Sequence, residues 1–351
     1  MRLTTAVLPL AASAFALQHH GVQIPLEPST AIPSGPFTLD TIPLLGFGTW
    51  NLKGDNVSEA VSWAIQTGYR HIDCAAAYGN EKEVGKGIAD GLLKTGLKRE
   101  DLWITSKLWN DQYIHHPILS ATSCSPHHSH GTTAPQTAID TTLRNLGLTY
   151  LDLYHMHWPV SQSLLHKNTI EYLPTWSSMV LLHSKGLARH IGISNFSPAQ
   201  LRDLLAHTSI PPYAHQMELH PYLQQSEWLA FHEEHGIKVT AYSPLAGSNP
   251  TYGSYPEGLE PLLNNTVLRE IGEKRGCTPA QVALAWGMGR GTSVIPKSQH
   301  KERIEEDFGS LECGLEEGDV EMVDGLGVVK HRFNNPSEDW KVELYEGLEG
   351  V

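Results

Sequence analysis

Basic residues and long hydrophobic runs are both scarce in this chain. Its 351 residues carry 25 Lys and Arg against 38 Asp and Glu, which gives a formal net charge of −13 at pH 7. Neutralising a phosphate backbone needs clustered cations, so the balance excludes a general nucleic-acid binder, although a local cationic patch can still hold a small anion. Beyond residue 16 no apolar stretch approaches the roughly 20 residues of a transmembrane helix. We therefore expect neither nucleic acid nor membrane as a partner.

Cysteine is also rare. The four cysteines are Cys74, Cys124, Cys277 and Cys313, and no two of them form a Cys-x-x-Cys pair. An even count permits disulfides if the chain is exported. Cys74 follows the strand-like segment 71–73, so we predict it to be a small buried hydrophobe. The sequence leaves the pairing of the other three open.

Two familiar catalytic fingerprints are missing. Gly46-x-Gly48 is followed by Asn51 where a dinucleotide fold of the Rossmann type needs a third glycine. The segment 232–235, His-Glu-Glu-His, lacks the zinc-protease spacing, and we interpret it as a solvated helix end. The irregular segment 119–135 contains a cluster of Cys and His residues that could bind a soft divalent metal. Metal sites need ligands on rigid elements, however, so we predict no metal. That cluster is Cys124, His127, His128 and His130.

The first residues differ from the rest of the chain. Arg2, an apolar run from Ala6 to Ala16 and the small-x-small pattern 14–16 predict a signal peptide over residues 1–16. The Pro-rich residues 17–36 then form an N-terminal tail. Asn56 and Asn264 begin Asn-x-Ser/Thr tripeptides that an exported chain could carry glycosylated. We expect a secretory or secreted protein, with a cytoplasmic protein bearing an uncleaved extension as the alternative.

From residue 37 short apolar runs alternate with segments of helical periodicity. Eight strands with intervening helices predict a parallel sheet closed into a (β/α)8 barrel of the TIM type, an α/β domain spanning 37–351 with a loop insertion at about 119–135. The expected strands are 44–46, 71–73, 102–106, 151–157, 190–194, 215–218, 238–241 and 293–295. The expected helices are 57–66, 81–93, 137–146, 176–184, 198–205, 227–235 and 279–288.

Four titratable residues lie at or just beyond the ends of successive strands: Asp73, Tyr78, Lys107 and His157. In a parallel barrel these ends share one rim, so we expect the four side chains to converge. A Lys ammonium lowers the pKa of a nearby Tyr phenol, an Asp fixes the Lys, and a His orients a carbonyl oxygen. This combination suits carbonyl reduction, in which an alkoxide develops and must be protonated. Each residue taken singly would be an ordinary cap, packing or surface residue.

The motifs 46–50 (GFGTW), 68–81 (GYRHIDCAAAYGNE), 151–159, 191–196 (IGISNF) and 295–298 (IPKS) resemble the aldo-keto reductase superfamily over residues 37–344. The resemblance implies a barrel enzyme that reduces aldehydes or ketones with NADPH. Tyr78 would be its general acid, within the tetrad Asp73, Tyr78, Lys107 and His157. A redox-sensing module that binds NADP(H) without turnover is the alternative, and we expect a monomer, with a dimer as the other possibility.

The resemblance also implies the cofactor contacts. Ser194, Asn195 and Gln216 would hold the nicotinamide carboxamide, Tyr242 would stack on its ring, and Ser243 and Leu245 would contact the pyrophosphate. Trp50 and Trp109 would line the substrate pocket with His157, under a C-terminal tail comprising 331–336 and Trp340. The remaining implied cofactor residues are Lys297, Ser298 and Arg303 at the 2′-phosphate, Glu306 and Asp307 near the adenine, and Gly48, Thr49, Trp50 and Ile295 elsewhere along the cofactor.

Two residues depart from the family pattern. Asp307 stands where the family usually has Asn, so we expect its charge to weaken cofactor binding. His155 replaces a usual aliphatic residue, and we predict a packed interior side chain. The long segment 119–135 is the third departure, because it could obstruct or extend the substrate rim.

Overall fold

The computed structural model describes residues 41–54, 56–113, 134–162, 168–252 and 255–350. The predicted signal peptide and tail, the expected loop as far as residue 133, and the four candidate metal ligands within that loop lie outside these residues. Ala134 and Pro135, which we expected in the loop, begin a helix instead. Among the described residues no helix is both long enough and apolar enough to cross a membrane.

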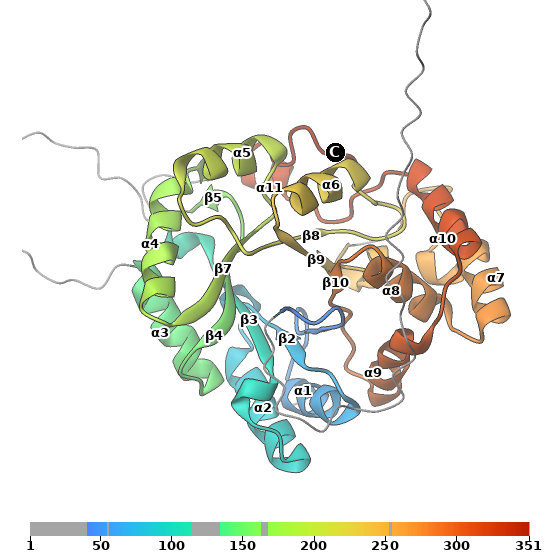
Figure 1. The fold of residues 1–351 in the computed structure, drawn as a ribbon, viewed down its shortest axis with the longest axis horizontal. Helices are drawn as coiled ribbons and strands as arrows, with labels where there is room; N and C mark the ends of the chain where they lie inside the picture. The colour runs from blue at the N-terminus through green and yellow to red at the C-terminus, as the bar shows by residue number, and fades with distance from the viewer. Residues whose placement is uncertain (1–40, 55, 114–133, 163–167, 253–254, 351) are drawn as a thin grey trace, which may run out of the picture. The chain divides into compact units, whose positions relative to one another are not determined.

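Eight parallel strands pair in chain order to form the central sheet (Figure 1). The sheet closes because the amide of Val294 in the last strand donates to the carbonyl of Leu44 at 2.7 Å, and the amide of Gly46 donates to the Val294 carbonyl at 2.8 Å. The predicted barrel is therefore confirmed. Its strands are β1 (Phe47–Gly48), β2 (His71–Asp73), β3 (Trp103–Leu108), β4 (Leu151–Met156), β7 (Ala188–Ser194), β8 (Ala214–Glu218), β9 (Lys238–Tyr242) and β10 (Ser293–Val294).

Helices surround the strands (Figure 1). All seven expected helices are present, but three longer ones and the short α11 (Ser337–Trp340) were missed. The missed α9 (Lys301–Phe308) has six charged residues among eight, so it lacks a readable apolar stripe. The other two are α7 (Thr266–Arg275) and α10 (Glu317–Asp324). The expected ones are α1 (Asn56–Thr67), α2 (Glu81–Thr95), α3 (Ala134–Leu146), α4 (Leu173–Ser184), α5 (Pro198–His207), α6 (Ser226–Glu234) and α8 (Pro279–Gly289).

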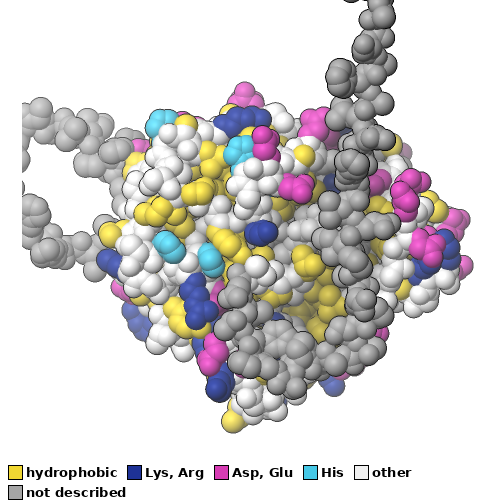
Figure 2. All heavy atoms as spheres, in the orientation of Figure 1, with side chains coloured by type: hydrophobic (Ala, Val, Ile, Leu, Met, Phe, Trp, Pro, Cys, Tyr) yellow, Lys and Arg dark blue, Asp and Glu magenta, His cyan; other side chains and the backbone are white. Residues whose placement is uncertain are grey.

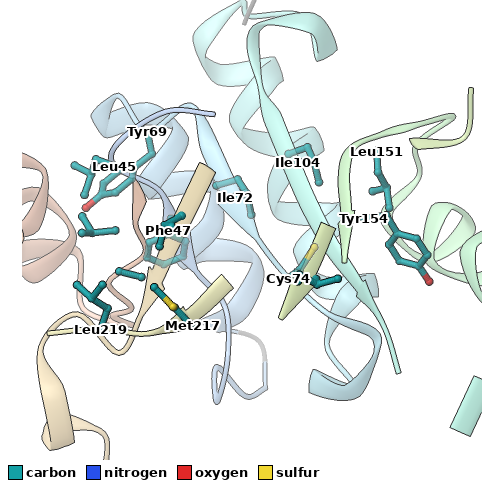
Figure 3. Packing of buried hydrophobic residues seen from close by; sticks show 14 of the residues in the cluster. Leu45, Phe47, Tyr69, Ile72, Cys74, Ile104, Leu151, Tyr154, Met217 and Leu219 are labelled. Atoms are coloured by element: carbon teal, nitrogen blue, oxygen red, sulfur yellow. The ribbon is translucent and has the colours of Figure 1, made fainter. Parts of the chain in front are cut away.

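The hydrophobic core lies between the strands and the helices. Phe47, Ile72, Ile104 and Tyr154 belong to one buried cluster that runs through most of the barrel (Figure 3). Cys74 is buried in the same cluster, as predicted. Core packing therefore fixes each strand along its length and leaves the strand ends free to carry polar groups.

Glycine permits the tight contact between the first and last strands. A Cβ on Gly48 would lie 2.9 Å from the carbonyl oxygen of Ile295, closer than side chains pack, so only glycine fits here. The first strand begins later than predicted, at residue 47, while Leu45 forms only an isolated bridge to Val294. Outside the barrel a small hairpin pairs β5 (Val160–Ser161) with β6 (Thr169–Ile170), and the short α11 (Ser337–Trp340) lies in the C-terminal tail.

Candidate active site

A cavity of about 450 Å³ opens at the carboxyl ends of the barrel strands. Of the tetrad, Asp73, Tyr78 and His157 line it, and Lys107 lies directly behind Tyr78, fully buried. Four predicted cofactor residues lie outside the lining: Ser298, Arg303, Glu306 and Asp307. The other predicted residues all line it, namely Gly48, Thr49, Trp50, Trp109, Ser194, Asn195, Gln216, Tyr242, Ser243, Leu245, Ile295 and Lys297.

Three members of the tetrad are linked by hydrogen bonds centred on Lys107. Its ammonium Nζ lies 2.5 Å from a carboxylate oxygen of Asp73 at the end of β2, and 3.1 Å from the hydroxyl of Tyr78. A third bond, of 2.9 Å, goes to the carbonyl of Cys74. The ring of His157, just beyond β4, meets the ring of Tyr78 edge-on at 5.8 Å between centroids. The convergence expected from the strand ends is therefore present in the structure.

The protonation states follow from burial and neighbouring charge. Burial raises the pKa of Tyr78 to about 12 and outweighs the opposing effect of the Lys107 ammonium. Lys107 does lower the pKa of the phenol, as expected, but the effect of burial is larger. Burial alone would lower the pKa of Lys107, but Asp73 and Tyr78 together raise it. Burial, then Lys107, lowers the pKa of His157 well below its ordinary value. At neutral pH the site thus holds a protonated phenol, an ammonium and a neutral imidazole.

The residues predicted to hold a carboxamide form a connected polar wall. The side-chain amide of Asn195 donates to the His157 carbonyl and to Ser194 Oγ, both at 3.0 Å. Tyr242 donates to Asn195 Oδ1 at 2.8 Å, and Gln216 donates to the second carboxylate oxygen of Asp73 at 2.7 Å. Asn195 has a φ of +63°, a left-handed conformation that side chains seldom adopt and that tends to occur at functional sites. These contacts tie the wall rigidly to the tetrad.

Two cations form a cationic corner at the edge of the cavity: Lys297, which lines it, and Arg303 on α9. Burial lowers the pKa of Lys297, and the positive charge of Arg303 lowers it further. Within the described part of the chain neither cation forms an ion pair with a carboxylate. Two adjacent cations without such a partner suit a bound phosphate. Gly48 lies beside this corner, where its amide donates to the carbonyl of Pro296 at 2.9 Å, and its missing side chain leaves the backbone there uncrowded. The donor set therefore fits a phosphorylated dinucleotide.

Asp307, the departure from the family pattern, is buried on α9. Burial raises its pKa to about 7, helped by Glu306 and opposed by Arg303. A substantial part of this carboxyl is therefore protonated near neutral pH. This reduces the charge that we expected to oppose cofactor binding.

The sequence analysis missed part of the cavity wall. Tyr252, whose hydroxyl lies 2.6 Å from Ser243 Oγ, and Trp158 line the cavity without having been predicted. Tyr252 follows β9 in an irregular segment with no periodicity to mark it. Trp340 also lines it and meets Trp158 edge-on at 5.0 Å between centroids, which confirms that the tail covers the pocket.

The C-terminal tail is held by one buried carboxylate. Glu218, at the end of β8, accepts a hydrogen bond of 2.7 Å from the amide of Phe333 and one of 2.9 Å from the amide of Asn334. Although burial opposes it, hydrogen bonds and charge from His220 and the charge of Arg332 keep the pKa of Glu218 below its ordinary value. Asn334 lines the cavity, so Glu218 couples the barrel to the wall of the pocket. The sequence held no signal for this contact.

Two histidines outside the tetrad, His155 and His232, are buried in the structure. His155 is fully buried, as predicted, and burial together with Lys107 keeps it neutral. His232 is also buried, so the solvated helix end was wrong for this residue. Its Nε2 lies 2.7 Å from Nδ1 of His215, whose Nε2 accepts from the amide of Phe196 at 3.1 Å. His232 therefore supports the loop after β7. Among the described residues no group of His, Cys, Asp and Glu is arranged to hold a metal.

Comparison with known proteins identifies the family. The model of the Aldo/keto reductase family matches residues 44–327. An aldo/keto reductase of Synechocystis is 41% identical over 81% of this chain and 85% of its own. Aldo-keto reductase family 1 member A1 of Gallus gallus is 40% identical over 81% of this chain and 85% of its own. The crystal structure of a Bombyx mori aldo-keto reductase in complex with NADP superposes with a TM-score of 0.76 at 33% identity, covering 87% of this chain and 95% of that one. The chain belongs to the aldo/keto reductase family and is an oxidoreductase.

Proposed function

We propose that this protein reduces aldehydes and ketones to alcohols with NADPH, and that Tyr78 is the proton donor. NADP(H) is the cofactor, and when bound it supplies the hydride that the carbonyl carbon accepts. The observation that carries the proposal is the hydrogen bond of 3.1 Å between Lys107 and Tyr78, inside a buried site where Asp73 balances the charge of Lys107. An alkoxide forming there would be stabilised by fixed donors rather than by water.

Each member of the tetrad has a separate task. Tyr78 hydrogen bonds to the carbonyl oxygen and gives up its phenolic proton as negative charge develops there. The ammonium of Lys107 stabilises the phenolate that remains, and Asp73 keeps that ammonium charged and in position. His157 is neutral, so it retains an N–H that can donate to the same oxygen and orient the carbonyl. His157 and Tyr78 thus hold the substrate oxygen from two directions.

The cofactor contacts are proposed on the polar wall and the cationic corner. Ser194, Asn195 and Gln216 would bind the carboxamide, and Tyr242 would provide the stacking face. Lys297 and Arg303 would bind the 2′-phosphate, which favours NADPH over NADH because the two cations lose a charged partner when that phosphate is missing. The remaining predicted residues would complete the site along the dinucleotide.

The substrate pocket is largely aromatic, with a polar side chain at its edge. Trp50, Trp109, Trp158 and Trp340 line it, together with the amide of Asn334. Such a wall suits aldehydes with an apolar or aromatic body, while the amide can bind a hydroxyl group of an aldose. We propose aldehydes as the preferred substrates and aldoses as slower ones.

The test is the loss of NADPH absorbance with a panel of aromatic, aliphatic and sugar aldehydes, for the wild type and for Tyr78→Phe. Removing the phenolic proton should lower kcat by about 10²–10⁴-fold, the usual contribution of a general acid. The dissociation constant for NADPH, measured by protein fluorescence, should change less than about threefold, since the phenyl ring is retained. Tyr113→Phe is the matched control, because its buried hydroxyl bonds to the backbone of Trp158 rather than to a side chain of the tetrad.

The outcomes separate the candidate functions. Turnover that collapses in Tyr78→Phe and survives in Tyr113→Phe supports the reductase. A wild type that binds NADPH but reduces none of the panel would instead favour the redox-sensing module. Equal turnover in Tyr78→Phe and the wild type would refute the assignment of the proton donor.

A further inference from the structure

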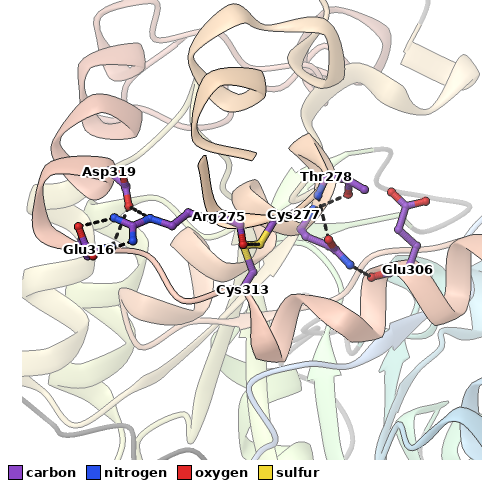
Figure 4. Close-up of a disulfide and its surroundings, with 8 residues drawn as sticks. Arg275, Cys277, Thr278, Glu306, Cys313, Glu316 and Asp319 are labelled. Carbon is purple, nitrogen blue, oxygen red and sulfur yellow. Dashed lines mark hydrogen bonds and ion pairs between the residues drawn. A yellow bond between two sulfur atoms is a disulfide. The ribbon is translucent and has the colours of Figure 1, made fainter. Parts of the chain in front are cut away.

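A disulfide joins two segments whose pairing the sequence left open. Cys277, between α7 and α8, is bonded to Cys313, and their Cα atoms lie 6.0 Å apart (Figure 4). That separation falls within the range of about 4.4–6.8 Å usual for disulfides. Arg275, beside Cys277, forms ion pairs with Glu316 and Asp319, beside Cys313. The two segments are thus held together by charge as well as by the covalent bond, so closing it requires no movement of the backbone.

An exposed asparagine lies next to this disulfide. Asn264 begins the tripeptide Asn-Asn-Thr, and both Asn264 and Thr266 are exposed. Asn264 and Cys277 line the same surface groove, which has a volume of about 480 Å³. Acidic and basic side chains gather over α7 and α10 on this side of the protein (Figure 2). Asn56, which begins the tripeptide Asn-Val-Ser at the first residue of α1, is exposed as well.

A third tripeptide provides an internal comparison. Asn195-Phe196-Ser197 has the same pattern, but Asn195 is only 3% exposed. Its amide nitrogen already donates to the His157 carbonyl and to Ser194. A sugar on this nitrogen would destroy the polar wall, whereas a sugar on Asn264 or Asn56 would extend into solvent. The folded barrel therefore accommodates a glycan at two of the three tripeptides.

We propose that Asn264 and Asn56 are N-glycosylation sites, and that the Cys277–Cys313 disulfide forms in the same oxidising secretory compartment. Disulfides persist in such compartments and are rare where thiols are kept reduced. The N-terminal residues 1–16 have the charge, apolar run and small-x-small pattern of an export signal. Export, oxidation and glycosylation are thus indicated by features in separate parts of the chain. This proposal is independent of the carbonyl-reduction proposal.

Both modifications balance chemically. In the oxidation, the thiols of Cys277 and Cys313 lose two protons and two electrons to a dithiol–disulfide oxidant, whose own disulfide is reduced to two thiols. In the glycosylation, the amide nitrogen of Asn264 or Asn56 bonds to the first sugar carbon of a lipid-diphosphate-linked oligosaccharide. The bond between that carbon and the diphosphate oxygen breaks, the lipid diphosphate leaves, and the amide loses one proton.

The test expresses the full chain, with its own N-terminus, in a eukaryotic host capable of secretion. Free thiols are alkylated at lysis, and the peptides are analysed by mass spectrometry with and without an endoglycosidase and a reductant. Asn264→Gln and Asn56→Gln each remove one acceptor. Thr266→Ala destroys the tripeptide at Asn264, while Thr266→Ser retains it and is the matched control.

We expect two endoglycosidase-sensitive steps in electrophoretic mobility, with one lost in each Gln variant. Thr266→Ala should match Asn264→Gln, and Thr266→Ser should match the wild type. The peptides bearing Cys277 and Cys313 should be linked until reduced. Unmodified Asn264 and Asn56 would overturn the glycosylation, as would a glycan on Asn195, and alkylated Cys277 and Cys313 would overturn the oxidation.

Discussion

Replacing Asp307 with Asn tests how strongly burial raises the pKa of this carboxyl and how much its ionisation destabilises the folded protein. The pKa of Asp307 is about 7, compared with 3.8 for a free side chain. Each pKa unit corresponds to about 1.4 kcal/mol, so ionising this carboxyl in the folded protein costs about 4 kcal/mol more than in the unfolded chain. Asn cannot ionise. Asp307→Asn should therefore be more stable than the wild type at alkaline pH.

The sign and pH window follow from proton linkage. Below about pH 4 the carboxyl is protonated in both states, so the favourable contribution of its neutral form is fully present there. As pH rises the unfolded chain releases this proton first, and the wild type loses about 1.4 kcal/mol per pH unit until pH reaches about 7. Above pH 8 the loss is complete. The difference between Asp307→Asn and the wild type should thus grow from pH 5 to pH 8 and then stay constant.

Urea unfolding followed by fluorescence at pH 5, 6, 7 and 8 measures this difference directly. The matched control is Glu302→Gln, which removes an exposed carboxylate from the same helix and should alter stability by less than about 0.5 kcal/mol at every pH. A difference for Asp307→Asn that is the same at pH 5 and pH 8 would refute the argument, because it would show that ionisation of Asp307 is not involved.

Three further substitutions test other contacts. Glu218→Gln weakens the hydrogen bonds that hold the C-terminal tail. A loss of about 1.4 kcal/mol in substrate binding should raise KM for aldehydes about tenfold in steady-state kinetics. Unchanged KM would show that the tail is held by other contacts. Trp340→Ala should also raise KM for aromatic aldehydes about tenfold, with NADPH affinity unchanged by fluorescence titration. Replacing both Cys277 and Cys313 with Ser opens a loop of 36 residues and should lower the free energy of unfolding by about 4 kcal/mol in urea titrations.

The sequence predicted the convergence of the tetrad better than it predicted the pocket around it, for a physical reason. Asp73 and His157 occur at recognisable strand ends, and parallel pairing brings strand ends together whatever the loops do. Tyr252 and Asn334 belong to irregular segments whose paths depend on tertiary contacts, such as the bond from Glu218 to the tail. His232 was misread because it also contacts His215 on β8, and the pattern of its own helix does not reveal that contact. Local patterns locate regular elements, but they do not reveal contacts between a helix, a strand and a tail.

The pKa of Tyr78 also depends on tertiary burial that the sequence does not reveal, and its value bears on how the site suits reduction. From the sequence, Lys107 beside Tyr78 indicated a phenol with a lowered pKa. In the barrel, burial has the larger effect and raises the pKa of Tyr78 to about 12, while Asp73 compensates the Lys107 charge. The proposed proton donor is thus protonated before a carbonyl arrives. The ammonium becomes important when the proton leaves, because the phenolate then formed lies 3.1 Å from a fixed cation in a low dielectric. Burial keeps the phenol protonated before the proposed proton transfer, and Lys107 stabilises the phenolate after it.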